Sequence, residues 1–127
     1  MSISVQADDF DIGHEISKLS EGRTDIGAIV TFTGLVRDMA GGKKITDMEL
    51  EHYPGMTEEK LLQTVAQAKE RWPLEECLVI HRTGRLEPGD RIVLVAVASS
   101  HRDAAFEACR FVIDWLKTSA PFWKEET

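Results

Sequence analysis

Alternating and β-branched residues predict two strands at the start of the chain, separated by one short helix. Ile3 and Val5 alternate with polar neighbours, which is typical of a first strand. Apolar side chains at positions 12, 16 and 19 share one helix face, so residues 11–19 are predicted to form a short helix. The segment GAIVTFTG, residues 27–34, is rich in β-branched and aromatic side chains and predicts a second strand.

A polar, glycine-containing stretch and another alternating segment follow. Residues 35–44 contain Gly41-Gly42 and four charged side chains, which favours a flexible loop. In residues 45–53, acidic and apolar side chains alternate, with Met48 and Leu50 on one side. This alternation predicts a strand with one buried face.

The second half of the chain predicts a longer helix and two buried strands. Thr57 is a suitable cap for a helix that Pro73 ends. Its expected apolar stripe consists of Leu61, Leu62, Val65, Ala68 and Trp72. Leu78–Ile80 predicts a strand, and residues 91–99 are so uniformly apolar that they predict a strand covered on both faces.

A last amphipathic helix is predicted over residues 101–119. Residues 100–103, Ser-His-Arg-Asp, match a helix-capping signature with Ser100 as the cap. The expected core stripe is Ala105, Phe106, Cys109, Val112, Ile113 and Leu116. Pro121 cannot donate a hydrogen bond to the carbonyl of Lys117, so the helix is expected to loosen there. Strands in adjacent pairs with about three interspersed helices indicate an α+β fold with mixed or antiparallel strands.

Composition limits the class of protein. The 127 residues contain no linker or repeat, which predicts a single domain over residues 1–127. A net charge of −7 argues against a protein that coats nucleic acid or an anionic membrane, but it does not exclude a local cationic site.

Two cysteines, Cys77 and Cys109, are too few for a disulfide framework and lack metal-ligand spacing. They are expected to be small buried hydrophobic residues. No signal peptide or membrane-spanning run is evident, so the protein is expected to be cytoplasmic, and we assign no metal and no cofactor.

Basic side chains gather in four places along the chain. These are Arg37 with Lys43 and Lys44; His81-Arg82 with Arg85; His101-Arg102; and Lys117 with Lys124. His101-Arg102 is the most informative pair, because extra positive charge in a first helical turn is disfavoured unless an anion binds there. The alternative is a solvated first turn whose arginine pairs with an acid elsewhere.

The other basic residues also have two interpretations each. Lys117 fits a last helical turn, and Lys124 lies beside Phe122 and Trp123, which could desolvate its amine for catalysis or simply anchor the chain. His81 is interpreted as a structural histidine at the end of a strand. From the residues alone, the chain is a small α+β domain with an anion pocket and one or two candidate catalytic lysines.

Four segments in this order and spacing resemble a known family: GAIVTFTGLVRD, LEHYPGM, HRTGRLEPGD and SSHRDAAFEACRFVIDWLKTSAPFWKEE. The family is the catalytic (large) subunit of molybdopterin synthase. The resemblance implies an α/β-hammerhead type of α+β fold and a homodimer at the centre of a heterotetramer. It also implies a sulfurtransferase of molybdenum cofactor biosynthesis. A small ubiquitin-like partner subunit would present its C-terminal Gly-Gly thiocarboxylate, and sulfur would pass to cyclic pyranopterin monophosphate to form the dithiolene of molybdopterin.

The resemblance also implies the site residues. Lys117 and Lys124 would be catalytic. The substrate would contact Leu35, Val36, Arg37, His101, Arg102, Lys117, Lys124, Glu125 and Glu126. His101 and Arg102 would hold the substrate phosphate, by family analogy across the dimer interface, so that five cations form one compact basic pocket.

Family chains usually continue past the WKEE block, whereas this one ends at Thr127 with a short or truncated tail. Residues 124–126 are therefore expected to fray. Two rival functions stay open: a non-catalytic dimeric adaptor that grips a partner's C-terminal tail, and a different enzyme that acts on a phosphorylated metabolite without a protein partner.

Overall fold

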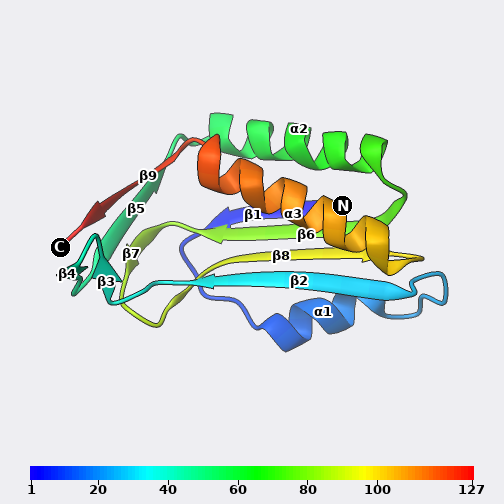
Figure 1. Ribbon diagram of the computed structural model, residues 1–127, viewed down its shortest axis with the longest axis horizontal. Coiled ribbons are helices and arrows are strands. Elements are labelled where there is room, and N and C mark those ends of the chain that lie inside the picture. The colour runs from blue at the N-terminus through cyan, green and yellow to red at the C-terminus, as the bar shows by residue number, and fades with distance from the viewer.

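The computed structural model describes residues 1–127 as three helices and nine strands (Figure 1). In chain order these are β1 (Ser2–Gln6), α1 (Ile12–Ser20), β2 (Ala28–Leu35), β3 (Met39–Ala40), β4 (Lys43–Lys44), β5 (Met48–His52), α2 (Met56–Arg71), β6 (Leu74–Arg82), β7 (Gly84–Leu86), β8 (Arg91–Ser99), α3 (Arg102–Thr118) and β9 (Phe122–Glu126). The α+β class with three helices and mixed strands is confirmed. None of the helices is long and apolar enough to cross a bilayer.

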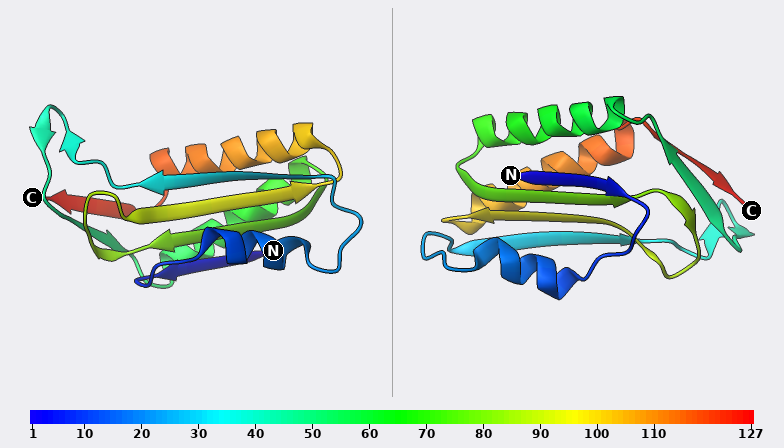
Figure 2. Two further views of the ribbon diagram at one scale, coloured as in Figure 1. Left: turned by 90° about the horizontal axis from the view of Figure 1, so that it is seen from below. Right: turned by 180° about the vertical axis from the view of Figure 1, so that it is seen from behind.

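The main sheet has the strand order β1-β6-β8-β2, with β1 parallel to β6 and the other pairs antiparallel. Helices α2 and α3 cover one face, and α1 covers the other (Figure 2). Strand β8 lies in the interior of the sheet and is buried on both faces, as its uniformly apolar sequence predicts.

Each face of the main sheet has its own apolar core. On the α2–α3 side, Leu61 of α2 and Val112 of α3 pack with Val79, Val95 and their neighbours. On the α1 side, Phe10 packs with strand residues that alternate with these, such as Leu78 and Ile80, and with Ile12 and Leu19. Two residues of the predicted helix stripes are instead solvent-exposed, because Leu62 and Phe106 lie at the outer edges of their stripes.

A smaller sheet, β7-β5-β9, extends from one end of the main sheet, beside a β3–β4 hairpin (Figure 1). The hairpin occupies part of the stretch predicted as a loop, and its turn uses positive φ angles at Gly41 and Gly42. Strand β9 was not predicted. It pairs with β5 from Phe122 to Glu126, and Thr127 exchanges backbone hydrogen bonds with Asp47, so the expected fraying of residues 124–126 is wrong.

Both predicted helix caps are wrong. Helix α2 begins one residue before Thr57, whose buried hydroxyl instead accepts a hydrogen bond from the backbone of Tyr53 and donates one to the Pro121 carbonyl. Helix α3 begins at Arg102 with His101 as its cap residue. The Ser100 hydroxyl instead donates to the backbone carbonyl of Asp25, 3.4 Å away, and does not cap the helix. Each of the two hydroxyls that local spacing assigns to a cap instead donates a hydrogen bond to a backbone carbonyl distant in the chain.

Candidate active site

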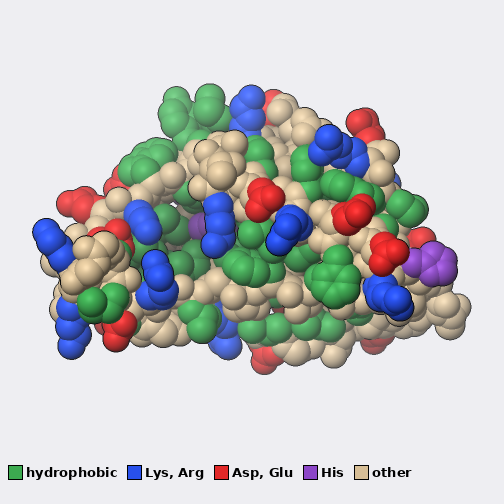
Figure 3. All heavy atoms as spheres, in the orientation of Figure 1, with side chains coloured by type: hydrophobic (Ala, Val, Ile, Leu, Met, Phe, Trp, Pro, Cys, Tyr) green, Lys and Arg blue, Asp and Glu red, His purple; other side chains and the backbone are tan.

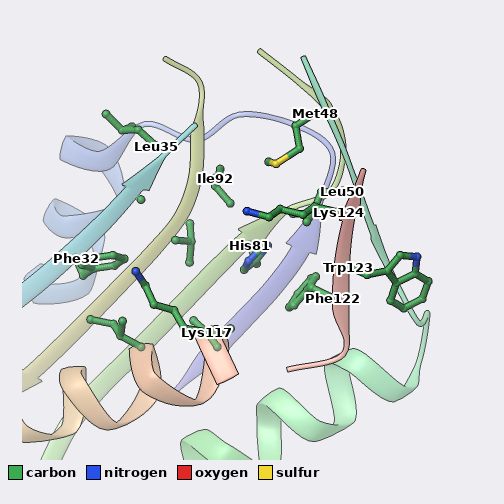
Figure 4. A pocket seen from close by; sticks show the side chains of 14 residues that line it. Phe32, Leu35, Met48, Leu50, His81, Ile92, Lys117, Phe122, Trp123 and Lys124 are labelled. Carbon is green, nitrogen blue, oxygen red and sulfur yellow. The ribbon is translucent and has the colours of Figure 1, made fainter. Parts of the chain in front are cut away.

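A cavity of about 490 Å³ opens where the two sheets meet the C-terminal end of α3. Its wall is mainly apolar and is contributed by β2, β5, β6, β8, α3 and β9. Figure 3 shows Lys and Arg side chains around this hollow and a histidine at its bottom. The charged or titratable side chains that line it are Lys117, Lys124 and His81 (Figure 4).

Lys117 reaches the cavity from the last turn of α3. Its Nζ lies 5.7 Å from the centroid of the Phe32 ring on β2, within the range of a cation–π contact. The side chain is exposed and forms no ion pair, so its ammonium is available to a ligand. The predicted placement of this lysine at a pocket agrees with the structure, although its chemical role stays a prediction.

Lys124 reaches the same cavity from β9, opposite Leu50 of β5. Its side chain is 58% exposed, and its Nζ lies 3.8 Å from a carboxylate oxygen of Glu126. Because side chains alternate along a strand, Phe122 and Lys124 face the cavity while Trp123 points away (Figure 4). The Trp123 indole donates to Glu51 instead, 2.9 Å away. Of the two interpretations of these aromatic residues, anchoring of the chain fits the position of the Trp123 indole better than desolvation of the Lys124 amine.

The segment after β2 continues the site. A smaller hollow of about 90 Å³ is lined by Leu35, Val36, Arg37, Lys124 and Glu126, together with apolar neighbours. It shares Leu35, Met48, Ile92 and Lys124 with the main cavity, so the two hollows lie next to each other. Glu125 lines neither hollow, because it alternates with its neighbours and pairs with Glu49 on the other face of the small sheet.

His101 and Arg102 lie away from this cavity. Both are exposed at the N-terminal end of α3, whereas Lys117 lies in its last turn. At about 1.5 Å of rise per residue, the helix separates Arg102 from Lys117 by roughly 22 Å. The five cations therefore do not meet within one chain, and their expected meeting across the dimer interface stays a prediction. The helix places one cationic group at each of its ends.

His81 is the site residue whose position was missed from the sequence. It lies on β6, is only 8% exposed, and lines the cavity. Its Nδ1 is 2.9 Å from the carbonyl oxygen of Arg82, and its ring stacks on Phe122 with a centroid distance of 3.9 Å. Burial lowers the pKa of His81 to about 4, so the ring is neutral at neutral pH. The sequence around His81 could not show this, because one wall of the cavity is formed by β9, which pairs with β5 far along the chain.

His81 should make the stability of the fold depend on pH. The unfolded chain takes up a proton near the ordinary pKa of 6.5, whereas the folded imidazole stays neutral until the pH approaches its pKa of about 4. Stability present above pH 6.5 is therefore lost as the pH falls toward 4, by about 2 kcal/mol between pH 7 and pH 5. Urea denaturation at both pH values should show a smaller loss for His81→Phe. An equal loss in both proteins would contradict this prediction.

The fold and the cavity define a small α+β domain in which two lysines and a buried histidine line one mainly apolar pocket. The family model described as "MoaE protein" matches residues 5–119. The chain is 57% identical over 125 residues to the molybdopterin synthase catalytic subunit of Ralstonia nicotianae, covering 98% of this chain and 71% of the relative. It is 54% identical over 126 residues to that of Pseudomonas aeruginosa, covering 99% and 84%.

Solved structures agree with this assignment. The MoaE protein of Burkholderia ambifaria superposes with a TM-score of 0.90 at 50% identity, covering 99% of this chain and 82% of that one. Molybdopterin synthase from Staphylococcus aureus gives a TM-score of 0.87 at 34% identity, covering 98% and 89%. The chain belongs to the MoaE family and is an enzyme subunit of molybdopterin synthesis. The family resemblance deduced from the sequence is confirmed, and catalysis is favoured over the adaptor alternative.

Proposed function

We propose that the cavity transfers sulfur from the C-terminal thiocarboxylate of a small ubiquitin-like subunit to cyclic pyranopterin monophosphate, forming the dithiolene of molybdopterin. The observation that carries this proposal is the convergence of Lys117 and Lys124, from a helix end and a separate strand, on one mainly apolar cavity. In such a setting, preorganised ammonium groups stabilise an anionic tail and the charge that develops as sulfur attacks. Lys117 acts as the general acid and base, and Lys124 orients the tail.

The phosphate-holding residues require a second copy of the chain. His101 and Arg102 combine two cationic side chains with the free backbone N–H groups of a helix N-terminus, which suits a phosphate. Their distance from Lys117 along α3 excludes a shared site within one chain. We therefore place them in the neighbouring subunit's cavity within a homodimer, at the centre of a heterotetramer with two small subunits. This arrangement supplies Arg37, Lys117 and Lys124 from one chain and the phosphate clamp from the other.

Mixed dimers test this arrangement directly. A dimer of one Lys117→Ala chain and one Arg102→Ala chain contains one fully intact site if the residues combine across subunits. It is expected to retain about half of the wild-type rate of dithiolene formation, whereas each variant homodimer is nearly inactive. The mixed dimers are purified with two different affinity tags, one on each chain. The rate of dithiolene formation is then measured with the thiocarboxylated small subunit and the pyranopterin.

The matched control is a mixed dimer of Lys117→Ala and Lys124→Ala chains. Both lysines line the same cavity of the same chain, so each site in this dimer lacks one of them and activity should not return. If the first mixed dimer is as inactive as the control, the cross-subunit arrangement is wrong. If the wild-type complex binds the small subunit but forms no dithiolene, the sulfurtransferase proposal itself fails.

The two cysteines are not expected to carry sulfur. Both are buried, and burial raises the pKa of Cys77 to about 12 and that of Cys109 to about 11, so neither supplies a thiolate at neutral pH. Replacing both with Ala should lower the free energy of unfolding by roughly 1–3 kcal/mol and leave turnover per folded molecule unchanged. Thermal unfolding and the sulfur-transfer assay check the two parts. Lost turnover with an intact fold would show that a cysteine takes part.

A further inference from the structure

At the floor of the cavity, the buried side chain of His81 lies in a mainly apolar wall. Along β6, Val79 packs under α2 and α3 while Leu78 and Ile80 pack on the α1 side. His81 follows the alternation of Val79 and so faces the same side, at the point where the helices end and the cavity begins. A buried polar group at such a position needs a hydrogen-bond partner for each of its ring nitrogens.

The hydrogen bond at Nδ1 determines what the other nitrogen can do. The Arg82 carbonyl oxygen, 2.9 Å from Nδ1, can only accept, so Nδ1 carries the ring proton. The neutral ring then has a lone pair at Nε2, for which the protein provides no donor. In this structure, every side-chain nitrogen or oxygen that is fully buried has a hydrogen-bond partner. His81 Nε2 has no partner within the protein, so this atom is not fully buried. Because His81 lines the cavity, Nε2 is exposed there.

The ring is held in this orientation from several sides. Phe122 stacks on it with an interplanar angle of 16°, and Phe122 follows Pro121, whose carbonyl is held by the buried Thr57 hydroxyl. Strand β6 lies between β1 and β8, so the His81 backbone has Val5 of β1 as its partner on one side and Val93 of β8 on the other. A flip of the imidazole would break the Nδ1 hydrogen bond. The cavity therefore contains a fixed acceptor at its floor, beneath the two ammonium donors of Lys117 and Lys124.

We propose that His81 is a substrate-binding residue whose Nε2 accepts a hydrogen bond from an N–H or O–H group on the heterocycle of the small-molecule substrate. An anionic group alone would satisfy the lysines and leave Nε2 without a partner, so the cavity favours a ligand that combines an anion with a ring donor. This inference rests on the proposed function, since it assigns the orientation of the pyranopterin in that same site. It makes His81 a determinant of specificity rather than a proton carrier.

Three substitutions separate the acceptor from the packing of the ring. His81→Phe keeps a planar ring against Phe122 and removes both nitrogens. His81→Asn keeps a donor near Nδ1 and removes the acceptor, whereas His81→Gln places an amide oxygen near the position of Nε2. We expect KM for the pyranopterin to rise tenfold or more in the Phe and Asn variants, with kcat changed less than threefold. The Gln variant should stay within about threefold of wild-type KM.

The measurements use the full complex with the thiocarboxylated small subunit, and they include direct binding of the pyranopterin without turnover. Direct binding distinguishes a failure of this inference from a failure of the sulfurtransferase reaction. A rise in Kd for the small subunit with unchanged pyranopterin binding would assign the donor to an amide of the tail and overturn the proposal. Equal KM in all variants, with only thermal stability changed, would also overturn it. If the Phe variant does not fold, the comparison of Asn with Gln decides.

Discussion

Replacing Lys117 with Ala is expected to reduce dithiolene formation at least a hundredfold while leaving affinity for the small subunit within a few-fold of wild type. The magnitude is that of a lost general acid–base group. The side chain occupies one lip of the cavity at the end of α3, where its loss removes an ammonium without opening the apolar core. Single-turnover assays with the thiocarboxylated subunit measure the first effect, and calorimetric titration measures the second.

Two further variants sharpen this test. Lys117→Arg keeps the positive charge but cannot release a proton near neutral pH, so it should be nearly as inactive as Lys117→Ala. Lys69→Ala removes an exposed lysine from the last turn of a different helix, α2, and should leave activity unchanged. Full activity of Lys117→Ala would remove this lysine from the mechanism. Full activity of Lys117→Arg would restrict its role to charge.

Replacing Gly27 with Ala is expected to lower the free energy of unfolding by roughly 2–3 kcal/mol and the melting temperature by roughly 10 °C. A Cβ at this position would overlap the backbone carbonyl oxygen of Ser100, and backbone cannot move aside as a flexible side chain can. Gly27 also donates a backbone hydrogen bond of 2.9 Å to Ser99, which the displacement would strain. Thermal and urea unfolding of the purified variant provide the measurement.

Gly13→Ala is the matched control for this substitution. Gly13 lies inside α1 with no positive φ, and an added Cβ would meet only the Asp11 side chain, at an ordinary 3.5 Å. Alanine is therefore expected to stabilise the protein by about 0.5–1 kcal/mol. Equal effects at the two glycines would show that Ser100 does not approach Gly27 closely. Because Ser100 leads directly into α3, the Gly27 variant should also weaken whatever His101 and Arg102 bind.

The position of α3 connects these two experiments. The helix carries Lys117 at one end and the His101-Arg102 pair at the other, so its rigid length keeps the two cationic groups apart within a chain. Substitutions at Lys117 act on one cavity directly. Substitutions at Gly27 shift the start of the helix and, in the proposed dimer, act on the neighbouring cavity. Substitutions at Gly27 are therefore expected to weaken binding of the small-molecule substrate without weakening binding of the small subunit's tail.

Local patterns were sufficient for the elements whose burial repeats with a regular period. The 3.6-residue spacing of Leu61, Val65 and Ala68 predicted α2, and the uniformly apolar segment of residues 91–99 predicted a central, doubly covered β8. The same kind of pattern predicted the last helix to within one residue at each end. These helices and strands are specified by residues that are close in the sequence. Their apolar side chains must be buried, but the sequence pattern does not depend on which element buries them.

The sequence by itself thus determined the α+β class, the helices, the buried strands, the buried cysteines and the family to which the chain belongs. Only the tertiary structure decided that residues 122–126 form a strand, that Trp123 turns away from Lys124, and that His81 lies on the cavity floor. It also separated His101 and Arg102 from Lys117. Each of these features depends on a partner that is distant in the chain, as β9 depends on β5. The same holds for the Thr57 hydroxyl, which donates its hydrogen bond to the Pro121 carbonyl. Local spacing does not specify which distant backbone will pair with a strand edge or accept from a hydroxyl.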